Sequence, residues 1–424
     1  MESYIITGGY RLSGVVRASG AKNAVLPMLA GTVLTARKCI IRGAPRLRDV
    51  TVMSDILRLL GAEVHWATVP GQEPALVVDP SRLVNYQVEE SLTREMRSSI
   101  FLMGPLLGRM GRVRVAYPGG CAIGPRPIDL HLRGLAALGA RIREKFGFIY
   151  AEAPRLVGTE IHLDFPSVGA TENIMMAAVL AEGTTVIRNA AKEPEIVDLQ
   201  NFLNGMGARI KGAGTDVIRI EGTDRLGGTE HQVIPDRIEV GTFLVAAAIT
   251  GGELVIENVI PEHVESVCAK LRETGCQVGE EGCGRLRIRA PRRPKAVDIK
   301  TLPYPGFPTD MQPQMMALMC VADGTSVITE TVFENRFKQA EELRRMSANI
   351  KTDGRTAVVK GVAALSGATV EVSDLRSGAA LVLAGLVAEG ITRVEGVHHV
   401  DRGYECFEEK LRAVGARIKR VSDG

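Results

Sequence analysis

The chain repeats one short pattern six times, and this repeat constrains the fold more than any other feature of the sequence. Each copy joins the apolar end of a predicted helix to a small residue and then to a strand: LLGAEV, ALGARI, GMGARI, ETGCQV, RMSANI and AVGARI. The small residues are spaced 78, 68, 68, 72 and 68 residues apart, and they are Gly61, Gly139, Gly207, Gly275, Ser347 and Gly415. A repeat of roughly 70 residues is too long for a simple solenoid. We therefore interpret each copy as one small α/β unit.

The third unit shows the order of the elements most clearly. Small and apolar residues at helical spacing predict a helix over 167–183, and a strand follows over 184–189. A second helix is predicted over 193–207, and two further strands over 208–212 and 216–222 are separated by Gly-rich turn residues. The order helix, strand, helix, strand, strand describes the other units as well.

The sixth unit stops at ARIKRV without a final strand, whereas the chain begins with SYIITGG, which resembles a spare one. We infer that the N-terminal strand completes the last unit. This predicts one domain of residues 22–235 and a second domain of residues 1–21 plus 236–424. The chain then crosses between them twice, near Lys22 and within 233–237. Such a connection favours a hinge with a ligand site in the cleft between the domains; the alternative is two rigidly packed halves.

Composition excludes several classes of protein. The charge balance is 52 − 49 = +3, too small by itself to indicate a nucleic-acid partner, and no run of 18 apolar residues predicts a membrane span. The start of the chain lacks the pattern of a secretory signal. Seven scattered cysteines, an odd number, indicate a reducing compartment such as the cytoplasm. Cys276 and Cys283 are not spaced as half of a convincing zinc site, so no metal is expected.

Polar residues recur where the first helix of each unit should begin. Counting back 17 residues from one equivalent strand position in each unit gives Asn23, Arg97, Gly169, Ile238, Asp310 and Arg376. A helix N-terminus attracts anions, and an aspartate there is ordinary as an N-cap. Arginines oppose the helix dipole, so Arg97 and Arg376 favour an anionic ligand in front of them over a purely solvated surface.

The loop between the first strand and the second helix is longest in the second unit. The six lengths, counted from that strand position to the small residue of each repeat (the marker residue), are 21, 25, 21, 20, 20 and 22. The extra residues of the second unit lie around Cys121. Gly119 and Gly120 allow close backbone approach, and Arg126 favours the thiolate if it lies nearby. Such a cysteine is suited to act as a nucleophile or a proton donor. The alternative is a tolerated loop length that happens to include a cysteine.

A set of basic residues from both predicted domains completes the candidate site. Arginine suits bidentate contact with carboxylate and phosphate groups. The set consists of Lys22, Arg97, Arg126, Arg336, Arg376 and Arg402. The residues alone therefore predict a two-domain protein that closes on one polyanionic or two anionic substrates, with a reactive cysteine on a loop.

These segments resemble those of the bacterial enolpyruvyl transferases over essentially the whole chain. The motifs are SGAKNAVLP (19–27), REMRSSI (94–100), PGGCAIGPRPIDL (118–130), SVGAT (167–171), EPEIVD (193–198), FPTDMQ (307–312), ETVFENRF (330–337), DLR (374–376) and HVDRGY (399–404). The resemblance implies two inverse α/β barrels, each built of three βαβαββ-type units. It also implies transfer of the enolpyruvyl group of phosphoenolpyruvate to the 3-hydroxyl of UDP-N-acetylglucosamine, without a cofactor or metal, early in peptidoglycan synthesis.

The resemblance also assigns roles to individual residues. Phosphoenolpyruvate would be bound by Lys22, Arg126 and Arg402, with support from Arg336 and Arg376. The UDP-sugar would be held by Asn23, Arg97, Arg126, Pro127, Ile128, Asp129, Leu130, Asp310 and Val332. Asp310 is the candidate base for the sugar hydroxyl. Cys121 would donate the proton to the vinyl carbon, form a covalent adduct with phosphoenolpyruvate, and be the target of fosfomycin.

Two alternatives remain open at the level of sequence. One is the sister enzyme that acts on shikimate 3-phosphate, which shares the fold; the Cys121 loop and HVDRGY favour the UDP-sugar enzyme. The other is a non-catalytic relative that binds the UDP-sugar, although every expected reacting residue is present. The chain departs from some relatives at Phe165–Pro166, where they carry a lysine, and at Ser347, where the other five units have glycine. Oligomeric state does not follow from the sequence.

Overall fold

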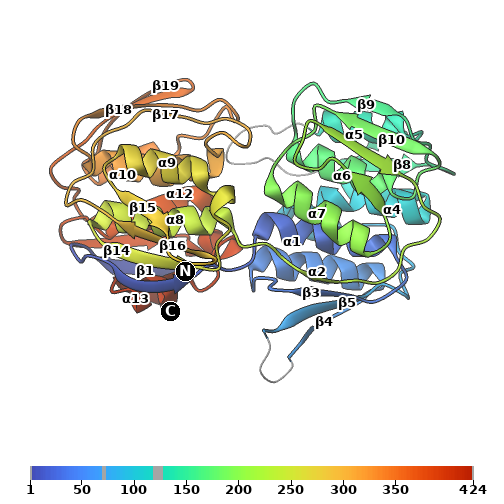
Figure 1. The fold of residues 1–424 in the computed structure, drawn as a ribbon, viewed down its shortest axis with the longest axis horizontal. Coiled ribbons are helices and arrows are strands. Elements are labelled where there is room, and N and C mark those ends of the chain that lie inside the picture. The colour runs from blue at the N-terminus through green and yellow to red at the C-terminus, as the bar shows by residue number, and fades with distance from the viewer. Residues whose placement is uncertain (1, 69–72, 118–127, 423–424) are drawn as a thin grey trace. The chain divides into compact units, whose positions relative to one another are not determined.

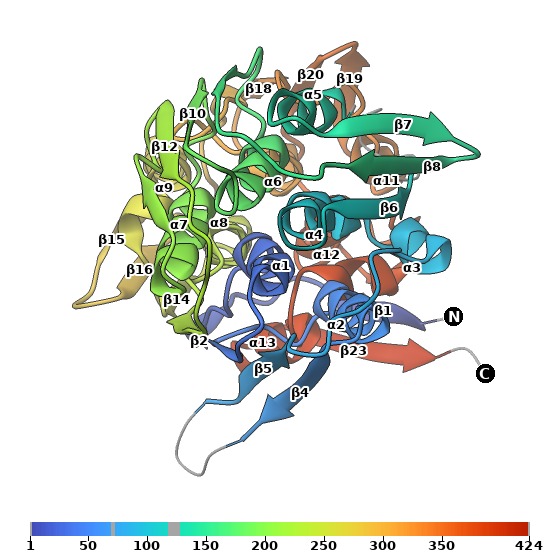
Figure 2. The same cartoon turned by 90° about the vertical axis from the view of Figure 1, so that its right-hand side faces the viewer.

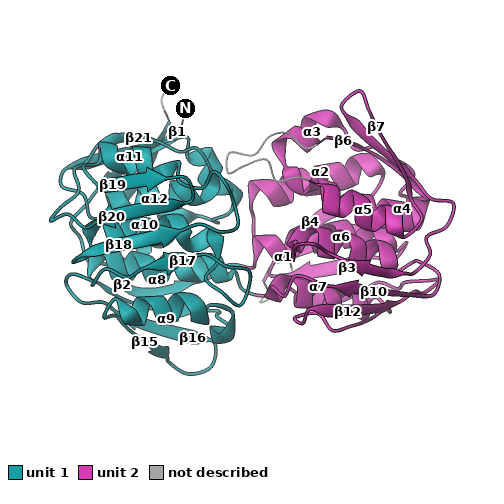
Figure 3. Cartoon of the chain, turned by 90° about the horizontal axis from the view of Figure 1, so that it is seen from above, with its two compact units in different colours: residues 1–19, 121–125, 235–424 teal, residues 20–120, 126–234 magenta. Residues whose placement is uncertain are grey.

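The computed structural model describes residues 2–68, 73–117 and 128–422 of the 424-residue chain (Figure 1). The described residues form two compact units (Figure 3). Unit 1 contains residues 2–19 and 235–422, and unit 2 contains residues 20–117 and 128–234 apart from the gap at 69–72. The chain therefore changes units between Ser19 and Gly20 and again between Ile234 and Pro235.

Six small sheets, three in each unit, correspond to the six repeats. In unit 2, the strand order of the first sheet is β13 (Glu230–Gln232), β3 (Cys39–Arg42), β5 (Ala75–Asp79) and β4 (Glu63–Ala67). The second sheet has the order β6 (Arg112–Ala116), β8 (Phe148–Glu152) and β7 (Arg141–Lys145). The third has the order β11 (Arg209–Lys211), β12 (Val217–Glu221), β10 (Thr184–Arg188) and β9 (Glu160–His162). In unit 1, one sheet has the strand order β21 (Thr369–Glu371), β22 (Ile391–Glu395), β1 (Glu2–Thr7) and β23 (Arg417–Ser422). Another has the order β15 (Gln277–Glu280), β16 (Arg285–Arg289), β14 (Glu253–Glu257) and β2 (Ser13–Arg17). The last has the order β17 (Ile299–Lys300), β18 (Thr325–Thr329), β20 (Thr356–Lys360) and β19 (Asn349–Asp353).

The helices follow the same division. Unit 2 contains α1 (Lys22–Gly31), α2 (Arg48–Leu60), α3 (Glu90–Glu95), α4 (Met103–Met110), α5 (Asp129–Ala137), α6 (Val168–Ala178) and α7 (Pro194–Gly205), with the 3₁₀ helices η1 (Thr32–Leu34) and η2 (Arg97–Leu102). Unit 1 contains α8 (Arg237–Thr250), α9 (Glu265–Glu273), α10 (Gln312–Val321), α11 (Gln339–Arg345), α12 (Leu375–Gly385) and α13 (Phe407–Ala413), with η3 (Pro261–His263), η4 (Thr309–Met311) and η5 (Val397–Arg402).

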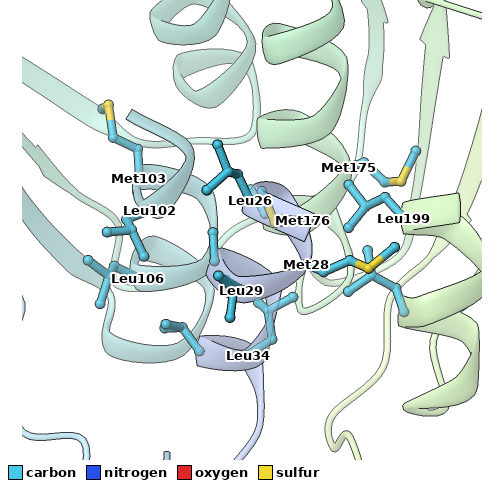
Figure 4. Packing of buried hydrophobic residues seen from close by; sticks show 14 of the residues in the cluster. Leu26, Met28, Leu29, Leu34, Leu102, Met103, Leu106, Met175, Met176 and Leu199 are labelled. Atoms are coloured by element: carbon cyan, nitrogen blue, oxygen red, sulfur yellow. The ribbon is translucent and has the colours of Figure 1, made fainter. Parts of the chain in front are cut away.

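One helix of each repeat lies inside its unit and is buried nearly all round. These inner helices are α1, α4 and α6 in unit 2 and α8, α10 and α12 in unit 1. Their sequences lack a polar face, which is typical of a helix surrounded by protein. Figure 2 shows α1, α4 and α6 enclosed by the sheets of unit 2. Figure 4 shows how residues such as Leu29, Leu106 and Met176 from these three helices pack together.

The N-terminal strand completes the last repeat, as inferred from the sequence. Strand β1 lies between β22 and β23 and pairs antiparallel with both, with Ile5 opposite Arg393 on one side and Lys419 on the other. Tyr4 and Ile6 of this strand are fully buried. The two ends of the chain are therefore joined in one sheet.

All six marker residues have a positive φ angle and lie just after the second helix of their repeat, where the next strand follows. These second helices are α2, α5, α7, α9, α11 and α13. The φ angles of the marker residues are +108° for Gly61, +102° for Gly139, +102° for Gly207, +93° for Gly275, +71° for Ser347 and +104° for Gly415. Glycine is common at this position because it has no Cβ to clash with the backbone. Ser347 is therefore a strained exception to the repeat.

Replacement of Ser347 by glycine should stabilise the protein. The left-handed conformation costs a non-glycine residue roughly 1–2 kcal/mol, whereas the loss of the Ser347 hydrogen bond to Ser366 at an exposed site (3.0 Å between hydroxyl oxygens) offsets only part of the gain. We expect a net increase of about 0.5–1 kcal/mol in the free energy of unfolding, measured by chemical denaturation.

The matched control makes the opposite change at the same position of the sixth repeat. In Gly415→Ala a new Cβ would lie 3.7 Å from the nearest atom, Arg11 O, so the site has room and only the backbone is strained. This variant should lose about 1–2 kcal/mol. Equal stability of both variants and the parent protein would contradict the strain argument.

Candidate active site

The six equivalent positions deduced from the repeat, four of them polar or charged, all lie at the beginning of a helix. Each is the first or second residue of its element: Asn23 in α1, Arg97 in η2, Gly169 in α6, Ile238 in α8, Asp310 in η4 and Arg376 in α12. In two repeats the helix begins with a 3₁₀ turn, η2 before α4 and η4 before α10, rather than directly as an α-helix. Four of these residues lie on inner helices, whereas Arg97 and Asp310 lie on the 3₁₀ turns that lead into the inner helices α4 and α10.

In unit 1, Asp310 lies between two buried arginines. Arg336 Nη2 donates to Asp310 Oδ1 at 2.8 Å, and Arg376 Nε donates to Asp310 Oδ2 at 3.2 Å. The arginine side chains are each 3% exposed, whereas the Asp310 side chain is 28% exposed. The Asp310 carboxylate is therefore the exposed group of this cluster. Each of its oxygens accepts a hydrogen bond from a different guanidinium.

The two arginines strongly favour the ionised form of Asp310. Burial raises the pKa of Asp310, but the charges and hydrogen bonds of Arg376 and Arg336 outweigh burial and hold the pKa well below its usual range. The two arginines also retain unused donors. Arg336 Nε and Arg376 Nη1 are buried without a well-formed hydrogen bond to any of the described residues.

The contribution of Asp310 to stability should be insensitive to pH until strongly acid conditions. Because its pKa is lower in the folded state than in the unfolded state, this contribution is fully present above the unfolded value of about 3.9 and falls as the pH drops through the folded value. The difference in unfolding free energy between the parent protein and Asp310→Asn should be constant from pH 7 to roughly pH 4 and shrink below it. A difference that instead grows as the pH falls from about 6 to 4 would indicate a raised pKa.

A buried carboxylate joins the Asp310 segment to the loop that carries Val332. Glu330, 1% exposed, accepts hydrogen bonds from the Thr309 hydroxyl (2.9 Å) and from the Val332 backbone N–H (2.8 Å). Its Oε1 also accepts from the Thr301 hydroxyl at 2.8 Å. Glu330 has no distinguishing signal in the sequence, because its role depends on partners on three separate segments.

The remaining predicted residue of unit 1, Arg402, is the last residue of η5. This 3₁₀ helix packs along α12, where a Cβ placed on Gly378 would lie 2.6 Å from Val400. Arg402 itself is half-buried. The elements bearing Arg376 and Arg402 are thus adjacent within unit 1.

In unit 2, Lys22 is buried at the beginning of α1 and is paired with an acid. Its Nζ lies 2.7 Å from Asp49 Oδ2, and the two side chains are 9% and 3% exposed. Asp49 lies in the first turn of α2, which packs against α1. The neighbouring Asn23 is exposed. Sequence reasoning missed Asp49, since an aspartate in the first turn of a helix is common for reasons unrelated to any site.

The other predicted residues of unit 2 lie on helix starts that contact one another. A Cβ added to Gly169 of α6 would lie 3.1 Å from His131 of α5 and 3.1 Å from Phe101 of η2. Helix η2 begins with Arg97 and also contacts α1. Ile128 is buried just before α5, where Leu130 is half-buried and Asp129 is exposed. Cys121, Arg126 and Pro127 lie outside the described residues.

Within 2–68, 73–117 and 128–422, no group of three or more His, Cys, Asp or Glu side chains is placed to hold a metal ion. No helix in the same part of the chain is long and apolar enough to cross a membrane.

Comparison with known proteins identifies close relatives. A family described as EPSP synthase (3-phosphoshikimate 1-carboxyvinyltransferase) matches residues 6–411. UDP-N-acetylglucosamine 1-carboxyvinyltransferase 1 of Symbiobacterium thermophilum is 65% identical over 99% of this chain and 95% of its own length. UDP-N-acetylglucosamine 1-carboxyvinyltransferase 2 of Carboxydothermus hydrogenoformans is 57% identical, with both chains covered completely.

Solved structures show the same fold. The enolpyruvyl transferase NikO from Streptomyces tendae is 26% identical with a TM-score of 0.89, covering 100% of this chain and 99% of its own. The EPSP synthase of Acinetobacter baumannii, at 19% identity and a TM-score of 0.75, covers both chains completely and supports the fold alone. The predicted α/β fold class is therefore confirmed.

Proposed function

This chain belongs to the EPSP synthase family of enolpyruvyl transferases, and we propose that it transfers the enolpyruvyl group of phosphoenolpyruvate to the 3-hydroxyl of UDP-N-acetylglucosamine. The observation that carries the proposal is the 65% identity, over 99% of the chain, to a relative named for this activity. The similarity to EPSP synthase structures is far weaker in sequence, at 19% identity. The comparisons therefore favour the UDP-sugar over shikimate 3-phosphate as the acceptor.

The proposed reaction needs an acid and a base at different atoms. The sugar 3-oxygen bonds to C2 of phosphoenolpyruvate while its proton leaves, and C3 gains a proton. Loss of phosphate from C2 and of one proton from C3 then restores the double bond. We assign the proton donor to C3 as Cys121 and the acceptor of the hydroxyl proton as Asp310. A positioned carboxylate with one exposed face suits this second role.

The low pKa of Asp310 makes it a weak base while both arginines are paired with it. Once an anionic substrate binds beside them, Arg336 and Arg376 would interact with both the substrate and Asp310, because each arginine retains an unused N–H. A shared guanidinium stabilises the Asp310 carboxylate less, so its pKa would rise toward a value that suits proton transfer. Substrate binding would thus activate the base.

We further propose that both units contribute to binding. Lys22, Arg126 and Arg402 would bind phosphoenolpyruvate, and Arg336 and Arg376 would stabilise charge on its phosphate. Asn23, Arg97, Pro127, Ile128, Asp129, Leu130 and Val332 would hold the UDP-sugar. The product would enter peptidoglycan precursor synthesis and so serve cell-wall growth and cell division. The six cysteines in the described part of the chain are free thiols, which suits a cytoplasmic enzyme.

Phosphate release from phosphoenolpyruvate, measured with UDP-N-acetylglucosamine and in parallel with shikimate 3-phosphate, tests the proposal. Release only with the UDP-sugar is expected. Release only with shikimate 3-phosphate would identify the sister activity. Folded protein that binds the UDP-sugar but releases phosphate with neither acceptor would be a non-catalytic relative.

Cys121→Ser should prevent inactivation by fosfomycin. The thiolate is the nucleophile that an epoxide alkylates, and a serine hydroxyl is not ionised near neutral pH. Mass spectrometry after incubation should show one adduct on the parent protein and none on the variant. Cys283→Ser, which removes an exposed free thiol elsewhere, is the matched control and should still be labelled. A covalent adduct that persists in Cys121→Ser would refute the assignment.

A further inference from the structure

The buried carboxylate of Glu330 accepts four hydrogen bonds, and each of the four donors is a neutral group. Its Oε1 accepts from the Thr301 hydroxyl and the Val332 backbone N–H, both at 2.8 Å. The Phe333 backbone N–H donates to the same oxygen at 3.2 Å. Its Oε2 accepts from the Thr309 hydroxyl at 2.9 Å. One side chain thus binds three segments of unit 1, one of them through Oε2 alone.

The backbone of Glu330 is fixed at the end of a sheet. Glu330 directly follows β18, and its backbone N–H donates to the backbone oxygen of Arg355, just before β20, at 2.8 Å. Thr301, just after β17, is tied to the next residue: the Thr331 N–H donates to Thr301 Oγ1 at 2.9 Å, and the Thr331 hydroxyl donates to Thr301 O at 2.5 Å. The carboxylate is therefore held by a regular element, which positions a group more precisely than a loop does.

The two carboxylate oxygens of Glu330 tether the two sides of the ion pair between Asp310 and Arg336. Thr309, the partner of Oε2, directly precedes Asp310 in η4. Phe333, a partner of Oε1, lies three residues before Arg336, whose guanidinium carbon lies over the Phe333 ring, 5.4 Å from its centroid. Arg336 Nη2 in turn donates to Asp310 Oδ1 at 2.8 Å. These contacts close a ring that begins and ends at Glu330.

We infer that Glu330 is a positioning residue that fixes Asp310 relative to Arg336 and to the loop that carries Val332. The inference rests on the proposed function, in which Asp310 accepts the hydroxyl proton and this loop holds the UDP-sugar. Glu330 is only 1% exposed and acts through the groups that it binds. A small displacement of a base from the proton that it accepts slows the transfer. Because all four donors are neutral, the property that matters is the reach of the side chain and not its charge.

The first test separates the reach of the Glu330 side chain from its charge. Glu330→Gln keeps the length, since its amide oxygen can accept from the loop while its amide nitrogen donates to the Thr309 oxygen. Glu330→Asp keeps the charge but is one methylene shorter, so it cannot reach both the loop and Thr309. We expect kcat for phosphate release to stay within about threefold of the parent value in the glutamine variant and to fall about 10- to 100-fold in the aspartate variant.

Two results of this comparison would overturn the inference. The opposite order of activities would show that Glu330 acts through its charge. Equal activities of the glutamine and aspartate variants would show that the reach of the side chain is immaterial.

Thr309 provides a second series that does not alter Glu330 itself. Thr309→Val removes the hydroxyl that donates to Oε2, whereas Thr309→Ser retains it. We expect kcat to fall about 10-fold in the valine variant, as for other small displacements, and to recover in the serine variant. The KM for UDP-N-acetylglucosamine should change little, because the contact of Glu330 with Val332 remains. Equal activity of the two variants would overturn the inference even if the Glu330 variants failed to fold.

Thr274→Val is the matched control for this series. Thr274 is fully buried at the end of α9 in unit 1, and its hydroxyl donates to Leu271 O at 2.6 Å. The control therefore loses a comparable hydrogen bond outside the candidate site. Its kcat should equal that of the parent protein.

A spectroscopic measurement on the unliganded protein separates this inference from the proposed function. Arg376 Nε donates to Asp310 Oδ2 at 3.2 Å, so the exchange of its proton with solvent depends on the position of Asp310. The ¹⁵N–¹H signal, assigned with Arg376→Lys, should exchange faster in Thr309→Val and Glu330→Asp than in the parent protein and in Thr274→Val. An inactive parent protein that shows this pattern would reject the proposed function and retain the positioning role. Unchanged exchange and unchanged kcat in Thr309→Val and Glu330→Asp, with an active parent protein, would reject the positioning role alone.

Discussion

Asp310→Asn should lower kcat by a factor of about 10² to 10⁴, the usual contribution of a positioned general base. The amide keeps the size of the side chain and one acceptor oxygen, so Arg336 or Arg376 retains a partner, but the group no longer accepts a proton. Steady-state rates of phosphate release as a function of both substrates measure the effect. Because the loss concerns proton transfer, kcat should fall much more than the KM for phosphoenolpyruvate rises.

Asp298→Asn is a matched control in the same unit. Asp298 Oδ1 accepts a hydrogen bond from the Val327 backbone N–H at an exposed site, so its amide variant should keep the parent activity. An Asp310→Asn variant with nearly full kcat would exclude Asp310 as the base. In that case Asp310 would serve only as the counter-ion of Arg336 and Arg376.

Lys22→Met should weaken phosphoenolpyruvate binding by at least about 30-fold, because the loss of a charged partner for an anion commonly costs 2–5 kcal/mol. Methionine approximates the length of lysine and removes only the charge. The same change leaves Asp49 buried at 3% exposure without its partner Lys22 Nζ. Breaking such a pair typically costs about 3–5 kcal/mol of stability, so the variant should also unfold at lower temperature.

The double variant Lys22→Met/Asp49→Asn separates the two effects. Removal of the Asp49 charge should restore most of the lost stability, since no buried ion remains without its partner. Binding of phosphoenolpyruvate, measured by calorimetry, should stay weak. If the double variant instead regained affinity, Lys22 would act by neutralising Asp49 and not by contacting the substrate.

The parts of the fold that depend on local sequence could be predicted. The marker residues reveal a left-handed helix end because that backbone conformation favours glycine wherever it occurs. The missing final strand and the spare N-terminal strand together predicted the pairing of β1 with β22 and β23. The helix starts at Asn23, Asp310 and Arg376 followed from counting along the repeat.

The partners of the site residues could not be predicted, because they come from distant segments. The pairing of Lys22 with Asp49 requires α1 to pack against α2, and nothing in either segment specifies that contact. Glu330 acquires its role only through hydrogen bonds to Thr301, Thr309 and Val332, which lie on separate segments. The sequence also presented Arg336 and Arg376 as ligands for an anion; the structure buries both beside Asp310, so their contact with substrate remains a prediction. The roles of Cys121, Arg126 and Pro127 likewise remain predictions.

The most direct test of the central claim is the structure of the product formed from [2-¹³C]phosphoenolpyruvate and UDP-N-acetylglucosamine. We predict that ¹³C NMR will show the labelled carbon as an enol ether joined to the 3-oxygen of the sugar, with one phosphate released for each product molecule. Labelled pyruvate and phosphate without a sugar adduct, or unchanged phosphoenolpyruvate, would contradict the account.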